Sequence, residues 1–308
     1  MSFNAKQVTR RTFVGGAGLA IAAGLVACGG KSTTKGGTSG TSSEDRSGNV
    51  YWLNFKPEMD EAIQSLGKKY MEKYPKVKVK IVTAASGTYT QTLTSEMDKQ
   101  GAPTLFVIGN MEGVKTWSDY AMDLKDTAIA KELSTDDYNL TDDSGKLVSI
   151  PYNYEAFGIA VNTELVEKAG HKMDDIKDFN SLKKVVEDIH SRASELGFDA
   201  FVATDMDDSS SWRVTGHLTN IVCYYDSRDA GGWKQAPATI SDKYIPNYKN
   251  LYDLAINNST VAPNALATGG HDPVTEFTGK KAAFIFSGSF NYADIKEGGV
   301  TSTACIPY

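Results

Sequence analysis

Residues 150–162 constrain the fold of this chain more than any other stretch. Pro151 ends the element before it, residues 152–155 form an aromatic, polar and acidic cluster, and residues 157–161 are apolar apart from Gly158. Such a run is typical of a buried strand that is entered from a polar, ligand-accessible loop. Because one α/β unit ends here and another begins, we expect two lobes with a binding cleft where the chain crosses between them.

Strands and helices alternate before this crossing. Residues 50–55 and 76–82 predict strands, the second an edge strand with lysines on its open side. Residues 57–74 predict a helix with a single apolar stripe, and residues 89–99 predict another. Residues 104–109 are apolar on both faces and predict a central strand. This order is typical of a parallel sheet with right-handed crossovers.

The pattern repeats after the crossing. Asn180 or Ser181 is expected to cap a helix that Gly197 ends, and residues 198–203 predict the next strand. The remaining predicted elements are helices at 212–225 and 248–256 and a buried strand at 281–286. A chain of 308 residues is long enough for two cores. We therefore predict an α/β fold of two lobes, each a mostly parallel sheet flanked by helices.

The N-terminus predicts export and lipid attachment. Arg10 and Arg11 precede an apolar, Gly/Ala-rich run over residues 15–27, which resembles a twin-arginine export signal and is too short for a stable membrane span. The alternative is an uncleaved helix that anchors the chain. Residues 25–28 read Leu-Val-Ala-Cys and resemble a bacterial lipobox, so Cys28 is the expected lipidated first residue of the mature protein. Several acyl chains on one residue would hold it durably on a membrane.

Charge and cysteine content narrow the remaining classes. Residues 1–27 hold three basic residues and no acidic one, so 29 basic against 38 acidic residues remain, a formal charge of −9. An acidic surface argues against nucleic-acid binding. Cys223 and Cys305 either pair outside the cytoplasm or stay as two buried free thiols. No metal-binding framework and no cofactor is predicted.

Four stretches carry a family resemblance. They are residues 50–74, residues 103–110, residues 151–170, and residues 277–290, which contain a Gly-Lys-Lys-Ala-Ala strand followed by Gly-Ser-Phe. In their order and spacing they resemble the extracellular solute-binding proteins of ABC importers, of the carbohydrate-binding type. The family has Trp at the position of Phe290, which is still a stacking ring.

The resemblance implies a periplasmic-binding-protein-like fold of type II with hinge strands. The implied organisation is a signal peptide at 1–27, a flexible linker at 28–48, lobe 1 at 49–157, lobe 2 at 158–302 and a return hinge strand at 303–308. Family members usually continue beyond such a strand, so we expect either a fragment or a shortened member. The implied protein is a monomer, anchored through Cys28 to the outer face of the cell membrane, which delivers its ligand to a membrane permease.

Candidate ligand-binding residues follow from sugar chemistry. Sugars present apolar CH faces and hydroxyl rims, so a site needs flat rings together with carboxylate, amide or guanidinium groups on loops after strands. The candidates are Trp52, Asn54, Glu58, Asn110, Tyr152, Asn153, Glu155, Trp212, Arg213, Trp233, Ser287 and Phe290. The resemblance ranks Glu155 first, because the family often bonds a sugar hydroxyl with a carboxylate there.

Several candidates also have a purely structural interpretation. Trp52 lies inside a predicted strand and is expected to be partly core, and Glu58 complements a helix N-terminus. Asn110 fits a turn, and Trp233 fits a loop anchor.

Enzymatic function is poorly supported. The sequence has no Gly-x-Ser-x-Gly elbow, no zinc-binding helix and no phosphate-binding loop, and its three Ser-x-x-Lys matches lie in the linker or in amphipathic helices. A surface glycan hydrolase would need a second carboxylate at a defined separation from the acid in residues 152–155. A protein-binding lipoprotein is the third hypothesis. The sequence favours a sugar-binding protein without catalysis.

Overall fold

The computed structural model describes residues 46–207, 209–231 and 239–307. The described residues belong to one compact unit, Asp45–Tyr308. The predicted signal peptide, Cys28, nearly all of the predicted linker and Trp233 lie outside the described residues. No helix in the described part of the chain is long and apolar enough to cross a membrane.

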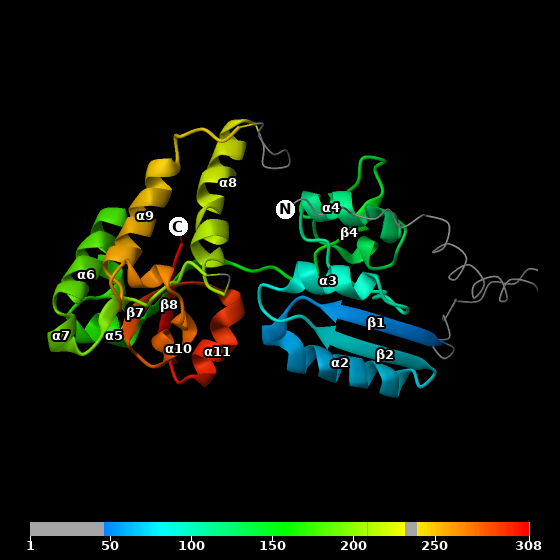
Figure 1. Cartoon of the computed structure of the whole chain (residues 1–308), viewed down its shortest axis with the longest axis horizontal. Helices are drawn as coiled ribbons and strands as arrows, with labels where there is room; N and C mark the ends of the chain where they lie inside the picture. Colours follow the sequence, from blue (N-terminus) through cyan, green and yellow to red (C-terminus); the bar gives the residue numbers. More distant parts are fainter. Residues whose placement is uncertain (1–45, 208, 232–238, 308) are drawn as a thin grey trace, which may run out of the picture. The chain divides into compact units, whose positions relative to one another are not determined.

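The first lobe begins with a parallel β–α–β unit (Figure 1). Its elements are β1 (Gly48–Asn54), the short 3-10 helix η2 (Pro57–Met59), α2 (Asp60–Lys73), β2 (Val77–Thr83) and α3 (Tyr89–Met97). Strands β1 and β2 pair in parallel from Gly48–Val77 to Asn54–Thr83. Pro57 begins η2, since its ring fixes the backbone torsion that a first helical turn needs.

The predicted strand over residues 104–109 is wrong. Only Leu105 forms an isolated parallel bridge, to Trp52, and Leu105 is half exposed. Its carbonyl accepts a hydrogen bond from the amide of Leu53, and its own amide donates to Tyr51. The chain then turns away, and β1 gains no longer partner on this side. The lobe is completed by α4 (Met111–Trp117), η3 (Ser118–Tyr120), η4 (Ala130–Glu132) and the antiparallel pair β3 (Leu140–Thr141) and β4 (Leu147–Ser149).

The second lobe contains a four-stranded sheet in the order β6-β7-β5-β8. The strands are β5 (Phe157–Asn162), β6 (Asp199–Phe201), β7 (Ala282–Gly288) and β8 (Thr303–Ile306). The helices are α5 (Thr163–Lys168), η5 (Met173–Asp175), α6 (Phe179–Ser191), α7 (Ala193–Leu196), the π-helix η6 (Arg213–Leu218), α8 (Asn220–Asp229), α9 (Ile245–Asn257), η7 (Ala265–Ala267), α10 (Pro273–Thr278), η8 (Ser289–Asn291) and α11 (Tyr292–Glu297).

Strand directions in this sheet correct the expectation of a mostly parallel arrangement. β6 and β7 are parallel, but β5 runs antiparallel to both β7 and β8. The reason lies in the crossing. β5 begins beside the carboxyl end of β7, and β8 ends beside the beginning of β5. A strand that starts at one end of the sheet and strands that finish at that same end must run in opposite directions.

The helix cap and the apolar stripe also differ in detail from the predictions. Asp178 caps α6 by accepting a hydrogen bond from the Ser181 amide at 2.8 Å, so the cap lies two residues before the predicted Asn180. In α2, Ile63 and Gly67 are buried, whereas Leu66 is 56% exposed, and Met59 of η2 is 37% exposed. The stripe is thus narrower than predicted, because α2 covers a sheet of only two long strands.

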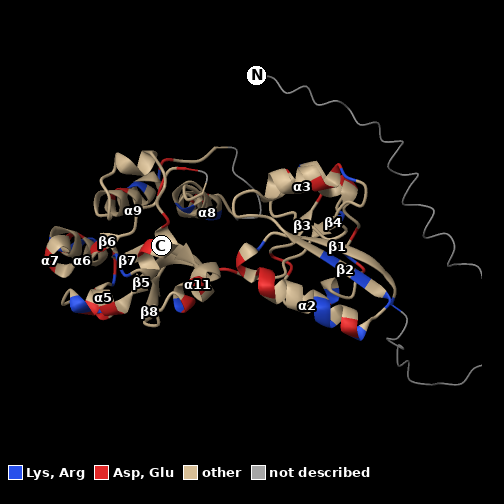
Figure 2. Ribbon diagram, turned by 60° about the horizontal axis from the view of Figure 1, so that its bottom comes forward, with Lys and Arg blue, Asp and Glu red and all other residues tan. Residues whose placement is uncertain are grey.

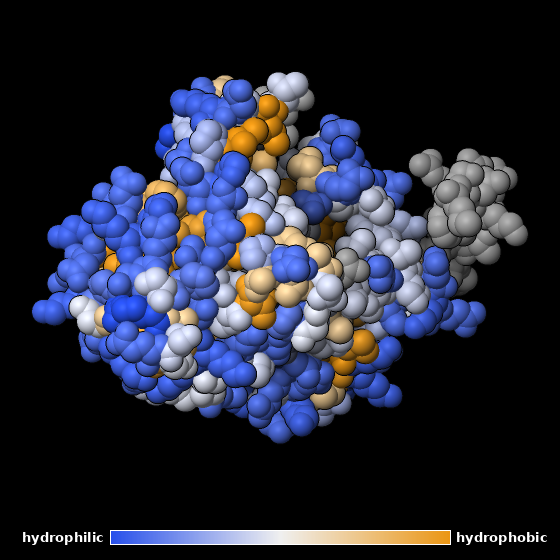
Figure 3. Space-filling model, turned by 60° about the vertical axis from the view of Figure 1, so that its left-hand side comes forward, coloured by the Kyte–Doolittle hydropathy of each residue, from blue (hydrophilic) through white to orange (hydrophobic). Residues whose placement is uncertain are grey.

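The larger core lies in the second lobe. It joins β5, β6 and β7 to α6 and α9 around Phe201, Phe284 and Phe286, all at most 2% exposed. The first lobe has smaller clusters, such as the one around Leu53, Tyr89 and Leu93. Cys223 and Cys305 are both free. The surface seen in Figure 3 is mostly hydrophilic, with scattered apolar patches.

Candidate functional site

Four ring side chains gather where β5 begins and β7 ends. Phe157 stacks on His217 with ring centroids 4.1 Å apart and planes 10° from parallel. Phe290 lies 6.2 Å from Phe157, and Trp212 lies 5.7 Å from Phe290. We call Phe157, Trp212, His217 and Phe290 the aromatic cluster. Its members come from three separate segments, so it forms only when the second lobe has folded.

A glycine and two backbone contacts fix this cluster. The carbonyl of Ala156 accepts a hydrogen bond from the Ser289 amide at 2.9 Å, and the Ala156 amide donates to the Ser289 hydroxyl at 3.2 Å. A Cβ atom at Gly288 would lie 2.8 Å from the Ala156 carbonyl oxygen and would collide with the Phe290 ring. Gly288 therefore permits the close approach that brings Phe290 over the start of β5.

A buried guanidinium backs the aromatic cluster. Arg213 is 5% exposed, and its Cζ lies 4.2 Å from the centroid of the Trp212 ring. Its Nη1 donates to the Ser210 hydroxyl at 3.3 Å, while its Nε has no hydrogen-bond partner. Burial lowers the pKa of Arg213 to about 10. Arg213 is the first residue of the π-helix η6 and Trp212 is its N-cap; this helix type is rare and frequent at functional sites.

A charged cluster of Lys56, Glu58 and Glu155 lies at the crossing. The Lys56 Nζ is 2.5 Å from Glu155 Oε2 and 3.4 Å from Glu58 Oε1. Lys56 is 8% exposed, so its charge requires these partners. Asn54 holds the loop that carries Lys56, since its amide accepts from the Lys56 amide at 2.9 Å and donates to the Lys56 carbonyl at 2.8 Å.

The charged cluster and the aromatic cluster are close to each other. The Lys56 Nζ lies 5.9 Å from the centroid of the Phe290 ring and 5.3 Å from that of Phe55. Burial lowers the pKa of His217, while the charge of Glu155 raises it and the charges of Arg213 and Lys56 lower it further. The imidazole therefore favours its neutral form in the folded protein.

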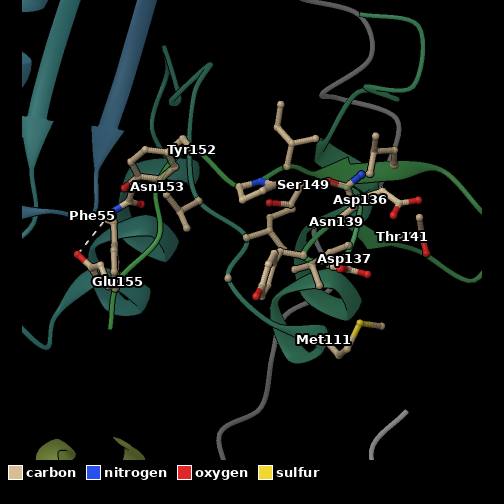
Figure 4. A pocket seen from close by; sticks show the side chains of 18 of the residues that line it. Phe55, Met111, Asp136, Asp137, Asn139, Thr141, Ser149, Tyr152, Asn153 and Glu155 are labelled. Atoms are coloured by element: carbon tan, nitrogen blue, oxygen red, sulfur yellow. Dashed lines mark hydrogen bonds between the residues drawn. The ribbon is translucent and has the colours of Figure 1, made fainter. Parts of the chain in front are cut away.

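A cavity of about 910 Å³ adjoins the charged cluster (Figure 4). Its wall combines Phe55, Lys56 and Glu155 with residues 136–141 and 149–153. The side chain of Asn153 points to Glu155, with Nδ2 3.4 Å from Oε1. Burial raises the pKa of Tyr152 to about 12, and the charges of Glu155 and Glu58 add to this effect. The cavity thus offers flat rings, amides and carboxylates together.

The structure brings six of the predicted site residues to these two clusters and the cavity. They are Glu58, Tyr152, Asn153, Glu155, Trp212 and Phe290. Arg213 packs against the Trp212 ring. Ser287 does not line the cavity; it is 1% exposed, and its hydroxyl accepts a hydrogen bond from the Asn291 side chain at 3.0 Å.

The other predicted residues lie in structural positions. Trp52 is half-buried in β1 and pairs with Ile81. Asn54 is fully buried, and Asn110 caps α4 by accepting from the Gly113 amide at 2.8 Å. For these side chains a ligand-binding role stays a prediction.

Sequence reasoning missed three residues of the site. Lys56 was overlooked because a lone lysine beside a proline carries no pattern. Phe157 belongs to the apolar run that predicts a buried strand, and His217 is not among the predicted site residues. The available signal was position, because Phe157 directly follows the acidic and aromatic loop and His217 lies five residues after Trp212. Among the described residues, no group of three or more His, Cys, Asp or Glu side chains is arranged to hold a metal ion.

The arrangement suits binding of a small molecule that has both apolar faces and polar edges. Rings provide flat apolar contact, and Lys56, Glu155 and Asn153 provide hydrogen bonds around them.

Comparison with solved structures supports the two-lobed fold. RafE in complex with raffinose has a TM-score of 0.64 at 19% identity, with 85% of this chain and 68% of that chain covered. The GacH receptor of Streptomyces glaucescens has a TM-score of 0.59 at 18% identity, with coverages of 86% and 67%. BlMnBP1 of Bifidobacterium animalis subsp. lactis, in complex with mannobiose, has a TM-score of 0.59 at 15% identity, with 85% of this chain and 63% of that chain covered.

The TM-scores show a shared fold, and at identities this low they show the fold alone. The chain spans about two thirds of the length of these structures. No curated protein sequence matches the chain. The model of one protein family does match, over residues 65–308, and it describes bacterial extracellular solute-binding proteins. The α/β, two-lobed fold predicted from the sequence is thereby confirmed, and the chain belongs to the bacterial extracellular solute-binding protein family.

Proposed function

We propose that this protein is the sugar-binding component of an ABC importer. It captures a sugar or oligosaccharide at the two clusters and releases it unchanged to a membrane permease. The observation that carries the proposal is the aromatic cluster beside the Lys56–Glu155 ion pair. Stacking rings match the CH faces of a sugar, and charged hydrogen-bonding groups match its hydroxyls.

The comparisons support the choice of ligand class. RafE is described in complex with raffinose, and BlMnBP1 in complex with mannobiose. We propose that the lobes, at 49–157 and 158–302, close on the ligand by bending near the crossing, and that residues 303–308 belong to the hinge. We propose further that a twin-arginine signal exports the protein, that lipid on Cys28 anchors it to the outer face of the cell membrane, and that it acts as a monomer.

Calorimetric titration with a panel of oligosaccharides tests the ligand class. The panel should include raffinose, mannobiose and chitin oligosaccharides, and the ligand should be recovered afterwards and weighed by mass spectrometry. We expect saturable binding of at least one sugar and recovery of that sugar intact. A shortened product would indicate a glycan hydrolase instead. No heat with any sugar would leave a protein-binding lipoprotein as the better hypothesis.

Lipid attachment has its own test. The full-length protein, expressed in a bacterial host, should partition into the detergent phase after phase separation of a cell extract. The Cys28→Ser variant should move to the aqueous phase. Equal partitioning of the two proteins would contradict anchoring through Cys28.

A further inference from the structure

The cavity beside the charged cluster extends well beyond it. Phe55 and Glu155 lie on one side of the view in Figure 4, and Asp136 and Asn139 lie on the other. We call the part of the wall formed by residues 136–141 the far end of the cavity. The volume of about 910 Å³ is within the range of about 300–1,000 Å³ that is typical of sites for drug-sized ligands. A ligand of that size is larger than a single hexose.

The far end repeats the chemistry of the wall beside the charged cluster. It presents the ring of Tyr138, which is 54% exposed, the carboxylate of Asp136, the amide of Asn139 and the hydroxyl of Thr141. A flat ring for the CH face of a sugar and polar groups for its hydroxyls are the combination that one sugar unit needs. The cavity therefore offers this combination twice.

Backbone contacts fix the shape of the far end. The Asn139 amide donates to the Asp136 carbonyl at 3.1 Å and closes a turn. Residues 140–141 then form β3, which lies side by side with β4 (Figure 2). Leu140 also packs against a buried cluster that contains Val148 of β4. A wall that is already ordered leaves fewer groups to be ordered when a ligand binds, which lowers the entropic cost of binding.

Tyr138 and Asn139 supply the ring and the amide of the far end. The Tyr138 ring meets the Tyr154 ring edge to face, with centroids 5.2 Å apart and planes at 69°, and this contact restrains its orientation. The Oδ1 atom of Asn139 is buried and has no hydrogen-bond partner. An unpaired buried acceptor is unfavourable. Turning this amide toward a ligand hydroxyl therefore breaks no hydrogen bond of the oxygen and supplies the missing one.

We propose that the far end is a subsite for a further sugar unit, so that the ligand is an oligosaccharide and not a single sugar. This inference rests on the proposed function, with one sugar unit beside the charged cluster. Because the units are linked, the second one enters its subsite at a high effective concentration and adds affinity without a second loss of translational freedom. Only ligands long enough to span the cavity receive this addition. The far end thereby sets the preferred chain length.

Calorimetric titration with sugars of increasing length tests the subsite. The probes are three series: mannose to mannotetraose, N-acetylglucosamine to the chitin tetrasaccharide, and galactose to stachyose. In a series that binds, we expect the wild-type affinity to rise at least about tenfold between the monosaccharide and the tetrasaccharide, where absence of heat counts as the detection limit. Equal affinity at every length would overturn the subsite and leave the proposed function standing.

The double variant Tyr138→Ala, Asn139→Ala removes the ring and the amide together. It should bind the tetrasaccharide about tenfold more weakly than wild type, and the shortest sugar that binds within about twofold of wild type. Tyr138→Phe keeps the flat face and should retain most of the length dependence. Melting at the wild-type temperature shows that both variants are folded. An equal loss for short and long sugars, or no loss for either, would overturn the subsite.

Tyr224→Ala is the matched control. Tyr224 is 51% exposed and meets a neighbouring ring, Tyr225, edge to face at a centroid distance of 5.2 Å, but it lies on α8 and is not part of the cavity wall. We expect this variant to keep the full length dependence, and its loss would show that the effect is not local to the far end. No binding in any series would contradict the proposed function and the subsite with it, whereas binding that is independent of length contradicts the subsite alone.

Discussion

The aromatic cluster and the charged cluster differ in what holds them. The rings of Phe157 and Phe290 are attached to β5 and to the end of β7, and β7 is buried along nearly its whole length. Lys56 and Glu155 lie on loops and Glu58 lies in the short helix η2, and the three are held by their charges and by the amide of Asn54. Packing therefore positions one half of the site, and electrostatics positions the other.

This difference assigns distinct roles to the halves. A ring set into a close-packed core keeps its orientation when the ligand leaves, so it supplies pre-organised contact area. Glu155 is the more exposed partner of the ion pair, with 29% side-chain exposure against 10% for Lys56, so it can turn toward a ligand hydroxyl while Glu58 continues to compensate the buried Lys56 charge. We expect mutations in the aromatic cluster to act mainly on affinity and stability, and mutations in the charged cluster to act on salt dependence.

Replacing Gly288 by Ala should have the largest effect. The new Cβ would approach the Ala156 carbonyl and collide with the Phe290 ring. Overpacking of this kind costs about 1–3 kcal/mol, and each kcal/mol lowers the unfolding midpoint by about 2–4 °C in a protein of this size. Calorimetric melting measures the shift, and ligand titration should show weakened binding.

Gly216→Ala is the matched control for this change. A Cβ at Gly216 meets no atom within 4 Å. The comparison fails if both variants melt together at the wild-type temperature, because the close approach at Gly288 would then be unimportant.

Trp212→Ala should weaken ligand binding by about 2 kcal/mol, since a ring at the centre of a site carries much of its contact area. Trp212→Phe should restore most of this loss, because it keeps a flat face. Tyr292→Ala removes a ring that is 58% exposed on α11, and it should bind like wild type. Isothermal titration measures all three. Wild-type affinity in Trp212→Ala would show that this ring does not contact the ligand.

Glu155→Ala should weaken binding by about 1 kcal/mol, because Lys56 retains Glu58 at 3.4 Å. A double-mutant cycle with Lys56→Met sharpens the comparison. We expect the two losses to be non-additive, and the wild-type affinity to fall with added salt more steeply than that of the double variant. Additive losses would show that the two residues act on the ligand independently.

The smallest expected effect is the pH dependence from His217. Burial lowers its pKa below the ordinary 6.5, so the unfolded chain binds a proton more readily than the folded one. The contribution of His217 to stability is therefore full above pH 6.5 and is lost as the pH falls through the folded-state pKa. The surrounding charges are Glu155, Arg213 and Lys56.

Melting curves at pH 7.5 and pH 5 test this, compared between wild type and His217→Gln. We expect a smaller drop in melting temperature in the variant. An identical drop would assign the acid sensitivity to other groups.

The family fold follows well from the sequence, because periodicity and turn residues act locally. Pro57 and the alternation of residues 76–82 correctly predict η2 and β2. The strand predicted over residues 104–109 is wrong, because an apolar run predicts burial but does not show that a neighbouring strand is available to pair with it. The direction of the strands in the second sheet could not be predicted either, because it depends on where the chain re-enters the lobe.

The site was predicted in part for the same reason. Trp212 and Glu155 stand in polar surroundings, which singles them out in the sequence. Lys56 and His217 become informative only through partners far away in the sequence. The Lys56 Nζ lies 2.5 Å from Glu155 Oε2, and the His217 ring centroid lies 4.1 Å from that of Phe157. Asn54 shows the converse error, since a polar residue at a strand end can serve its own loop instead of a ligand.

The burial of β7 has a consequence for local opening. Residues Ala282 to Phe286 are at most 1% exposed, and β7 is hydrogen-bonded on both sides, to β6 and to β5. Backbone amides in such a strand exchange with solvent deuterium only when the whole unit unfolds. Phe290 lies in η8, two residues beyond the end of β7, so we expect repeated loading and unloading not to loosen the surface that meets the ligand.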